Sequence, residues 1–370
     1  MNGQWLGEYS GTSKGRIILN VDALSSHFEG VAFLHSDNVV PSVAVGFRTQ
    51  NKDRTFRCRT DWIHPIDRNS GIIRPWEDIK GQYPDNVIVS TYADVEGMWN
   101  EEEIMLSWTS EIGNTGSCVL PRTKADTPSS LVPSRKDWDE YKTYVSTLEG
   151  RRNLFRGQNK PWRLRTSFHR SGRADLMRFM REDVQTLHKH LSARTKHVFN
   201  LDNPNENGAF YNLIQHHGYP TPLLDWTYSP YVAAFFAYRG ISQEDARRAS
   251  TSDKVRILVF DQERWRKDLS QVYQLISAQL HLSIGEYLAI ENERMIPQQA
   301  ASTLTNIDDI ETYIQSRETT GDAYLTAIDL PARERKKVIC ESGYMGITAG
   351  AMFPGLDGAC EELKERNFDI

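Results

Sequence analysis

One arginine follows two apolar residues and precedes a glycine in the segment Leu154-Phe-Arg-Gly-Gln158. The pattern predicts a strand that ends in a glycine turn, with Arg156 at the strand end. A guanidinium group there can bind a phosphate through two parallel N–H bonds, and Gly157 leaves the backbone room for the anion. The other interpretation is that Arg156 forms a structural ion pair, and the segment alone leaves both open.

A dense group of polar residues runs from Gln215 to Ala237, just before and into an apolar stretch. Asp225, Thr227 and Ser229 occupy alternate positions, so their side chains lie on one side of an extended chain. Pro230 suits the first turn of a helix, and Thr227 or Ser229 can cap it. The free N–H groups of that helix start favour an anion. The segment therefore predicts a second contribution to an anion site.

Positive charge is concentrated in residues 151–200, which contain 13 Lys and Arg but 3 Asp and Glu, whereas the whole chain has a net charge of -5. This local charge of +10 indicates an anionic partner, which is a nucleic acid, a nucleotide or a protein. Nearby aromatic residues, Phe155, Trp162 and Phe168, can stack on bases or fill a core. The alternative is a solvated surface that pairs with acidic residues elsewhere in the chain.

Histidines offer a third kind of chemistry, because His216, His217 and Asp225 could act in a nuclease. Adjacent residues of a strand point to opposite sides, however, which is poor geometry for a metal held by both histidines. His188 and His190 do not share a helix face either. Core or capping histidines are the favoured interpretation, and we expect no metal site.

The elements that position these residues differ between the two parts of the chain. Residues 1–122 predict an all-β barrel or sandwich with short strands separated by turn residues. Gln4–Tyr9 resembles the opening strand of up-and-down ligand-binding barrels. Five of the nine tryptophans lie in this part, where they either line a ligand pocket or fill a small core. The expected strands are 15–21, 39–47, 55–62, 86–92 and 104–109.

Residues 121–134 contain three prolines and several small polar residues, so we predict a linker at 123–134 and a second domain at 135–370. This domain mixes helices and strands, which gives the whole chain an α+β fold class. The expected helices are 138–148, 174–199, 231–238, 273–282 and one from 361 onward, and the expected strands are 154–156, 255–260 and 325–330.

The composition excludes several classes of protein. A net charge of -5 over 370 residues excludes a globally basic nucleic-acid coat protein. Four cysteines without a C-x-x-C pair exclude a disulfide framework and the usual structural zinc sites. The sequence begins without a secretory signal pattern and contains no run of ~18 apolar residues. We therefore expect a cytoplasmic protein with no membrane partner.

Together the two motifs resemble the FRG domain, a family named for a Phe-Arg-Gly motif. Phe155-Arg156-Gly157 supplies that motif, and residues 215–237 are similar to the most recognisable block of the family. Similarity continues through Asn292-Glu-Arg294 with Gln298-Gln299 and through residues 346–358, so it covers roughly 135–366. The chain departs from the family at Pro222, where a basic residue is frequent, and at Ala300, where a glycine is expected.

The same residues are more loosely similar to mono-ADP-ribosyltransferases of the Arg-Ser-Glu type, which have a split sheet. In these enzymes an Arg-Gly strand precedes a Ser-Thr-Ser-like strand and its helix, and Arg156-Gly157 and Trp226–Ser229 match these two elements. The resemblance implies that Arg156 holds the phosphates of NAD and that Thr227 or Ser229 orients the nicotinamide ribose. It also places Gly157, His216, Thr221 and Asp225 beside the NAD.

The third element of that family is a catalytic glutamate on a later strand, which we expect within residues 294–303. The candidates there are Gln298 and Gln299, with Glu291 and Glu293 just before them and Glu341 further along the chain. A carboxylate stabilises a developing positive charge and accepts a proton, whereas a glutamine amide does neither well. We select Gln299 and Glu293 for this role.

The function implied by these resemblances is an NAD-dependent mono-ADP-ribosyltransferase without a metal. We expect a nucleic-acid or protein acceptor bound through residues 151–200, with nucleic acid slightly favoured. The alternatives are a non-catalytic nucleotide- or nucleic-acid-binding module and a nuclease. The FRG resemblance implies a bacterial toxin or anti-phage effector with an antitoxin or regulatory partner, and the β domain would then recruit the target, recognise a signal or keep the enzyme inactive.

Overall fold

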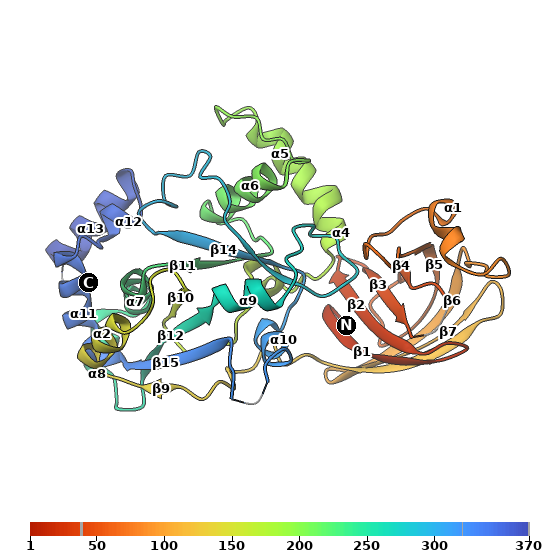
Figure 1. Ribbon diagram of the computed structural model, residues 1–370, viewed down its shortest axis with the longest axis horizontal. Helices are drawn as coiled ribbons and strands as arrows, with labels where there is room; N and C mark the ends of the chain where they lie inside the picture. The colour runs from red at the N-terminus through yellow and green to blue at the C-terminus, as the bar shows by residue number, and fades with distance from the viewer. Residues whose placement is uncertain (38–39, 320, 369–370) are drawn as a thin grey trace.

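The computed structural model describes residues 1–37, 40–319 and 321–368, and it contains two sheets, each with its own hydrophobic core. The strands of the first sheet lie within residues 3–121 and those of the second within 134–331. Figure 1 shows the first sheet on the right and the second, flanked by helices, on the left. In the described part of the chain, no helix combines the length and apolar character needed to cross a bilayer.

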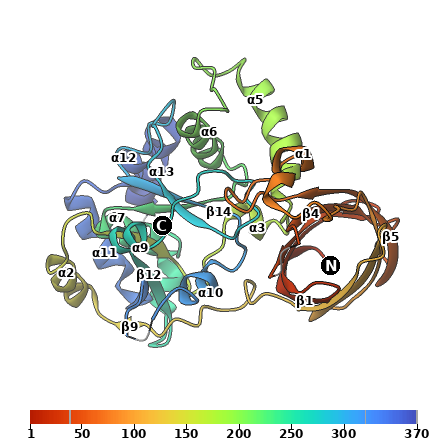
Figure 2. The same cartoon turned by 45° about the vertical axis from the view of Figure 1, so that its right-hand side comes forward.

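The first sheet is a closed antiparallel barrel, which Figure 2 shows along its axis. Its eight strands follow chain order, and β8 closes the barrel by pairing with β1. Because successive side chains of a strand point to opposite faces, alternate residues face the barrel interior: Ile17 and Leu19 point inward, whereas Ile18 points outward. The strands are β1 (Gly3–Gly11), β2 (Gly15–Ala23), β3 (Phe28–Ser36), β4 (Val43–Arg48), β5 (Thr55–Pro65), β6 (Ala93–Trp99), β7 (Glu103–Ser110) and β8 (Thr115–Pro121).

The barrel confirms the expected all-β architecture and selects the barrel over the sandwich. One predicted strand, 86–92, is wrong, because this segment is a loop and β6 begins only at Ala93. Its run of three β-branched residues, Val87-Ile88-Val89, lines the barrel interior from the loop, which explains its strand-like composition. The predicted strand 39–47 begins at Val43, and Val39 lies outside the described residues.

The second sheet has seven strands in the order β13-β14-β11-β10-β12-β15-β9. All neighbours are antiparallel except β15 and β9, which are parallel. The strands β10, β12 and β15 confirm the strands predicted at 154–156, 255–260 and 325–330. The glycine turn predicted after Arg156 is wrong, because β10 continues through Gly157 to Gln158, and both residues pair with β12. The strands are β9 (Ser134–Arg135), β10 (Asn153–Gln158), β11 (Leu223–Thr227), β12 (Lys254–Asp261), β13 (Leu282–Gly285), β14 (Ala300–Thr305) and β15 (Leu325–Pro331).

Helices cover both faces of this sheet. On one face, α2 (Trp138–Ser146), α7 (Pro230–Arg239) and α11 (Arg335–Tyr344) bury Trp138, Ala234 and Val338 against β10, β12 and β15. On the other face, α9 (Gln262–Asp268) and α10 (Ile310–Gln315) pack in a second cluster. Further helices include α3 (Ser167–Arg170), α4 (Leu176–Arg178), α5 (Gln185–Leu191), α6 (Pro204–His216), α8 (Gln243–Arg248), α12 (Ala349–Met352) and α13 (Leu356–Phe368).

Two predicted helices differ from the structure. The helix expected over 174–199 consists of α4, a π-helical turn at Phe179–Val184 and α5, and it ends at Leu191. The helix expected over 273–282 is absent, and turns lead there into β13. The side chain of Asn306 donates to the carbonyl oxygens of Ser277 and Gln279 at 3.1 and 2.9 Å, so tertiary contacts satisfy groups that helical bonds would otherwise use.

The barrel is fastened to the rest of the chain by buried polar contacts. Gln4 on β1 donates to the carbonyl oxygen of Asn306 at 2.8 Å and accepts from the N–H of Asp308 at 3.1 Å. Asp22 at the end of β2 is buried and accepts from Arg173 and from the N–H of Ala174. The outward face of the barrel wall therefore makes a specific interface.

Candidate functional site

The Phe-Arg-Gly segment lies in the middle of the second sheet, on β10, and each residue has a separate physical role. Phe155 is buried in the core between β10 and α7. A Cβ atom on Gly157 would lie 1.8 Å from the carbonyl oxygen of Ala233, so only glycine lets α7 approach the strand this closely. Arg156 lies between these two residues and points to the other side of the strand.

Arg156 lies where β10 and β11 diverge. The two strands pair at Phe155 and Thr227, whereas β10 pairs with β12 over six residues. Arg156 Nη1 donates to the main-chain oxygen of Asp225 at 2.6 Å, while its Nε is buried without a partner. Desolvation lowers the pKa of Arg156 to about 10, which still leaves the guanidinium charged at neutral pH. The structure therefore holds a partly unsatisfied cation beside the gap between the strands.

A chain of side-chain bonds holds Asp225 beside this arginine. Gln215 at the end of α6 donates its amide to the carboxylate of Asp225, and its carbonyl oxygen accepts from the hydroxyl of Thr221. Thr221 is buried and also accepts from the N–H of Leu223, so it positions Gln215 and does not itself line the cleft. Gln215 is thus a site residue that the sequence analysis did not select, although it begins the polar segment 215–237.

Thr227 and Ser229 have structural partners. The hydroxyl of Thr227 donates to the main-chain oxygen of Gln298 at 2.7 Å and accepts from the N–H of Ser229 at 3.0 Å. Ser229 caps α7, because its hydroxyl accepts from the N–H of Val232 at 3.2 Å. Thr227 lines the cleft and Ser229 does not. The alternation predicted for this segment therefore ends at Thr227, where the helix cap begins.

The cleft formed by these residues has a volume of about 900 Å³. Five arginines line it, and two of them, Arg163 and Arg165, pair with carboxylates. The other three are Arg156, Arg170 and Arg294, and the last two donate to the main-chain oxygens of Arg165 and His216. Desolvation lowers the pKa of Arg170, and the charge of Asp225 opposes this shift. In the described part of the chain none of these three arginines lies within ion-pair distance of a carboxylate. The aromatic residues of the cleft are Phe155, Trp162, Trp226, Phe236 and Phe353.

The glutamine and glutamate selected for the third strand lie outside the cleft. Gln299 and Glu293 are exposed, and neither lines the cleft, whereas Gln298 does and donates its amide to the oxygen of Met352 at 2.8 Å. Glu291 accepts from the N–H of His197. Glu341 bonds Trp138 on α2, away from β14. A one-residue difference between Gln298 and Gln299 decides which one faces the cleft, and spacing alone could not resolve it.

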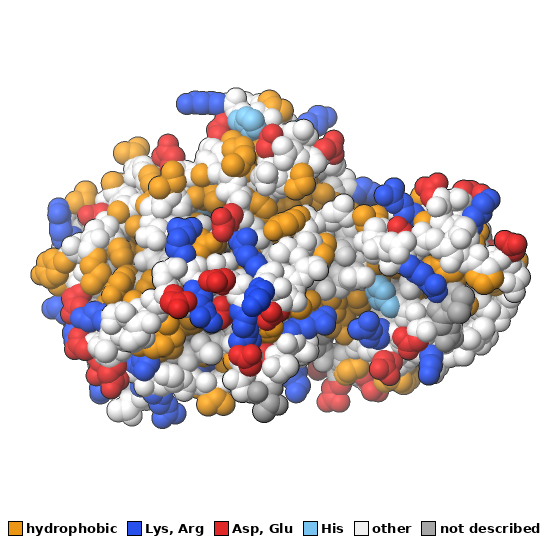
Figure 3. Space-filling model, viewed as in Figure 1, with side chains coloured by type: hydrophobic (Ala, Val, Ile, Leu, Met, Phe, Trp, Pro, Cys, Tyr) orange, Lys and Arg blue, Asp and Glu red, His pale blue; other side chains and the backbone are white. Residues whose placement is uncertain are grey.

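Much of the basic stretch forms ion pairs within the chain. Arg163 is buried against Asp309 and Glu311, and Arg165 pairs with Asp126 and Asp308. Arg152, Arg173, Arg178 and Arg181 also have acidic partners. Basic and acidic side chains are intermingled on the face that Figure 3 shows. Lys160, Lys189, Arg194 and Lys196 remain exposed, so the stretch is less available to a polyanion than its net charge predicts.

The histidines considered for a nuclease, His216 and His217, do not share one site with Asp225 in the described structure, because His217 is exposed. His216 lines the cleft with its Nδ1 2.7 Å from the side-chain oxygen of Asn292, whereas His217 is exposed. His188 approaches the main-chain oxygen of Phe199 at 2.7 Å. Over the residues that the structure describes, no cluster of three His, Cys, Asp or Glu could hold a metal ion.

Comparison with known proteins gives one match. Neither the curated proteins nor the solved structures include a significant match to this chain. The family model of the FRG domain matches residues 151–246, a segment that holds β10, α6, β11, α7 and most of the arginines described above. Residues 151–246, which supply Arg156, Arg170, Asp225 and Thr227 to the cleft, therefore match the FRG domain, and the match does not extend to the barrel or to β14.

Proposed function

We propose that the cleft binds NAD and that the chain transfers ADP-ribose from it to an acceptor. The observation that carries this proposal is the convergence of three neighbouring strands on one cleft. β10 supplies Arg156, β11 supplies Asp225 and Thr227, and the segment entering β14 supplies Gln298. In this proposal they correspond to the Arg-Gly strand, the hydroxyl strand and the later strand of the ADP-ribosyltransferase resemblance. The separation of β10 and β11 beyond a single pair supports that correspondence.

The charges of the cleft suit the pyrophosphate of a dinucleotide. Arg156, Arg170 and Arg294 bond only main-chain oxygens among the described residues and keep further N–H donors. The buried Nε of Arg156 lacks a partner, which a phosphate oxygen would supply. The half-exposed side chain of Trp162 on the same cleft offers a face for an adenine or nicotinamide ring.

Transfer requires a carboxylate, and we assign this role to Asp225 in place of Gln299 and Glu293. The carboxylates that line the cleft are Asp225 and Asp126, and Asp126 pairs with Arg165 whereas Asp225 faces Arg156. In the proposed step the bond from the ribose to nicotinamide breaks, and nicotinamide leaves with its electron pair. The acceptor heteroatom forms the new bond to that carbon, and its proton passes to Asp225.

Thr227 and Gln298 are positioning residues in this proposal. The hydroxyl of Thr227 is engaged by Gln298 and Ser229, so it fixes the entry into β14 and has no proton left for the ribose. Ser229 stabilises α7 and with it the helix residues Ala233 and Phe236, which line the cleft. The earlier expectation that Thr227 or Ser229 contacts the ribose directly is replaced by this indirect role.

Incubation of the full chain with NAD labelled in the adenylate phosphate, together with cell extract, tests the proposal. We expect label on nucleic acid or protein, release of nicotinamide, and loss of both in Arg156→Ala. Arg194→Ala is the matched control, because it removes an exposed arginine of the same basic stretch. Asp225→Asn should keep NAD binding within a few-fold but lower turnover by about 10²-fold or more. Wild-type turnover by both Arg156→Ala and Asp225→Asn would refute the assignment of the cleft as the NAD site.

One observation favours a second function, a nucleotide-binding module without catalysis. The third strand presents Gln298 to the cleft, where the ADP-ribosyltransferase resemblance calls for a glutamate. Calorimetric binding of NAD that is lost in Arg156→Ala, without any nicotinamide release by the wild-type chain, would select this function.

A further inference from the structure

The interior of the barrel encloses a cavity of about 560 Å³. Every strand contributes inward-facing residues to its wall, among them Leu19, Ala32, Phe47, Val95, Leu106 and Trp108. Among the described residues that line it there is no Asp, Glu, Lys, Arg or His, and burial lowers the pKa of the Met1 α-amino group, which also lines it, to about 5, so this group is neutral at pH 7.5. An eight-stranded barrel is just wide enough either to be filled by its side chains or to hold one small ligand, and this one is not filled.

The two ends of the cavity differ. At one end Trp5 is fully buried, and Phe28 and Trp99 pack edge to face with ring centroids 5.6 Å apart. At the other end the lining residues come from the loops between paired strands, where Ile88 is 66% exposed and Ile112 is 43% exposed. An apolar mouth of this kind lets a molecule enter along the barrel axis.

We propose that the barrel interior is a binding site for one small, uncharged molecule with a largely apolar body. Cavities of ~300–1,000 Å³ hold ligands of drug size, and the measured volume lies inside that range. A charged group in this interior would lose its hydration without gaining a counter-ion. Hydroxyl and amide groups of Ser90, Thr12 and Asn114 lie toward the mouth, so a neutral polar end of the ligand belongs there.

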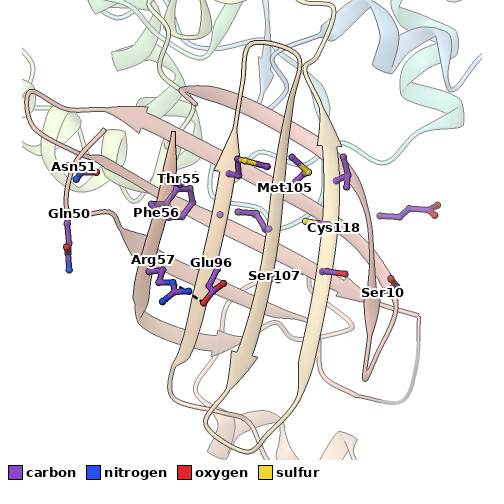
Figure 4. Close-up of a pocket in the computed structure, with 16 residues that line it drawn as sticks. Ser10, Gln50, Asn51, Thr55, Phe56, Arg57, Glu96, Met105, Ser107 and Cys118 are labelled. Carbon is purple, nitrogen blue, oxygen red and sulfur yellow. Dashed lines mark ion pairs between the residues drawn. The ribbon is translucent and has the colours of Figure 1, made fainter. Parts of the chain in front are cut away.

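The outer surface of the barrel offers a contrast. A hollow of about 990 Å³ lies over strands β5 to β8, and Figure 4 shows its residues, with Arg57 and Glu96 directed toward one another. These two side chains pair at 3.0 Å and are mostly exposed, as is much of the nearby surface. Their charges are already satisfied, so this hollow supplies no comparable argument for a ligand.

The wall of the cavity is also the wall of the interface. Inward residues of β2 and β3, such as Leu19 and Ala32, line the cavity. The outward residues Ile18 and Phe33 pack in one cluster with Ala278, which lies before β13 of the second sheet. The experiment therefore uses the full chain. A ligand that binds the folded state should also raise its unfolding temperature in proportion to its occupancy.

The probe is N-phenyl-1-naphthylamine, an uncharged fluorophore. We expect saturable binding of one molecule per chain, and displacement by 1-decanol at least ~10-fold more effective than by decanoate at pH 7.5, because burying the carboxylate is costly. Ala32→Trp fills the cavity and should weaken probe binding by at least ~10-fold. Ser107→Trp adds the same side chain to the outer face of β7 and should leave binding unchanged within ~2-fold.

Three results would overturn the proposal: no saturable binding to the wild-type chain, equal binding by Ala32→Trp and Ser107→Trp, or displacement by decanoate as effective as by decanol. Circular dichroism checks that each variant is folded. If Ala32→Trp does not fold, Val95→Phe replaces it, since this smaller change also projects into the cavity.

Discussion

Replacement of Gly157 by alanine tests why glycine follows the arginine of the motif. The new Cβ atom would lie 1.8 Å from the oxygen of Ala233 and 2.8 Å from the nitrogen of Ala237. Ordinary contacts begin at 3.4 Å, so α7 must retreat by about 1.6 Å from β10. Both obstructing atoms belong to the backbone, so no change of side-chain rotamer relieves the clash.

The expected cost follows from two opposing terms. Overpacking of this kind costs about 3 kcal/mol, the upper end of its usual range, because a helix has to move. The loss of glycine's freedom in the unfolded chain returns about 0.4–1 kcal/mol. We therefore expect the free energy of unfolding to fall by about 2 kcal/mol, and NAD affinity to fall as well, because Ala233 and Phe236 of α7 line the cleft.

Urea unfolding followed by circular dichroism measures this effect, with NAD affinity measured on the same samples. Gly150→Ala is the control, since a Cβ atom there meets nothing within 4 Å. We expect that variant to be unchanged or slightly stabilised. A Gly157→Ala protein that unfolds within about 0.5 kcal/mol of the wild-type value would show that close packing of α7 is not the reason for the glycine.

Three further predictions concern stability. His169 is buried with no partner for Nε2, and desolvation lowers its pKa to about 3, so the unfolded chain binds its proton more readily between pH 3 and 6.5. As the pH falls below 6.5, the free energy of unfolding should decrease through this residue by up to about 1.4 kcal/mol per pH unit. In urea titrations at pH 5 and 7, His169→Gln should therefore lose less stability on acidification than the wild-type chain. An equal loss in the two proteins would contradict this. Ser229→Ala should lower the free energy of unfolding by about 1 kcal/mol through loss of the α7 cap, and it should weaken NAD binding in calorimetry by less than Arg156→Ala does, because Ser229 acts on the cleft only through α7. Asp22→Ala should cost about 2–4 kcal/mol in the same unfolding assay, because Arg173 and two main-chain N–H groups lose a buried acceptor, and a cost below 1 kcal/mol would show that this contact does not hold the barrel.

Local patterns predicted most of the secondary structure around the site. The apolar run after Pro230 and the polar residues before it specify a capped helix wherever they occur, and α7 begins at Pro230 with Ser229 as its cap. The alternation in residues 15–21 and 104–109 specifies strands with one buried face. These features depend on neighbours within a few residues, so the sequence is sufficient for them.

The same local signals were misleading where distant residues compete. The β-branched run Val87-Ile88-Val89 is typical of a strand but lines the barrel from a loop. In the segment 273–282, the carbonyl groups of Ser277 and Gln279 accept from Asn306. The +10 charge of residues 151–200 left open whether the stretch binds an anionic partner or pairs with acidic residues elsewhere in the chain. Asp22 on β2 of the barrel and Asp308 after β14 neutralise part of this positive charge, and nothing in the sequence near residues 151–200 identifies these partners.

The sequence by itself determined the Phe-Arg-Gly strand, the capped helix α7 and the β character of the first 122 residues, because each depends on residues close together in the chain. Only the tertiary structure decided that β10, β11 and the entry to β14 meet at one cleft and that Gln298 faces it while Gln299 does not. It also decided that the barrel closes around a cavity whose described lining residues have no charged side chain. Strand order and side-chain direction arise from contacts between residues far apart in the chain, and those contacts exist only after folding.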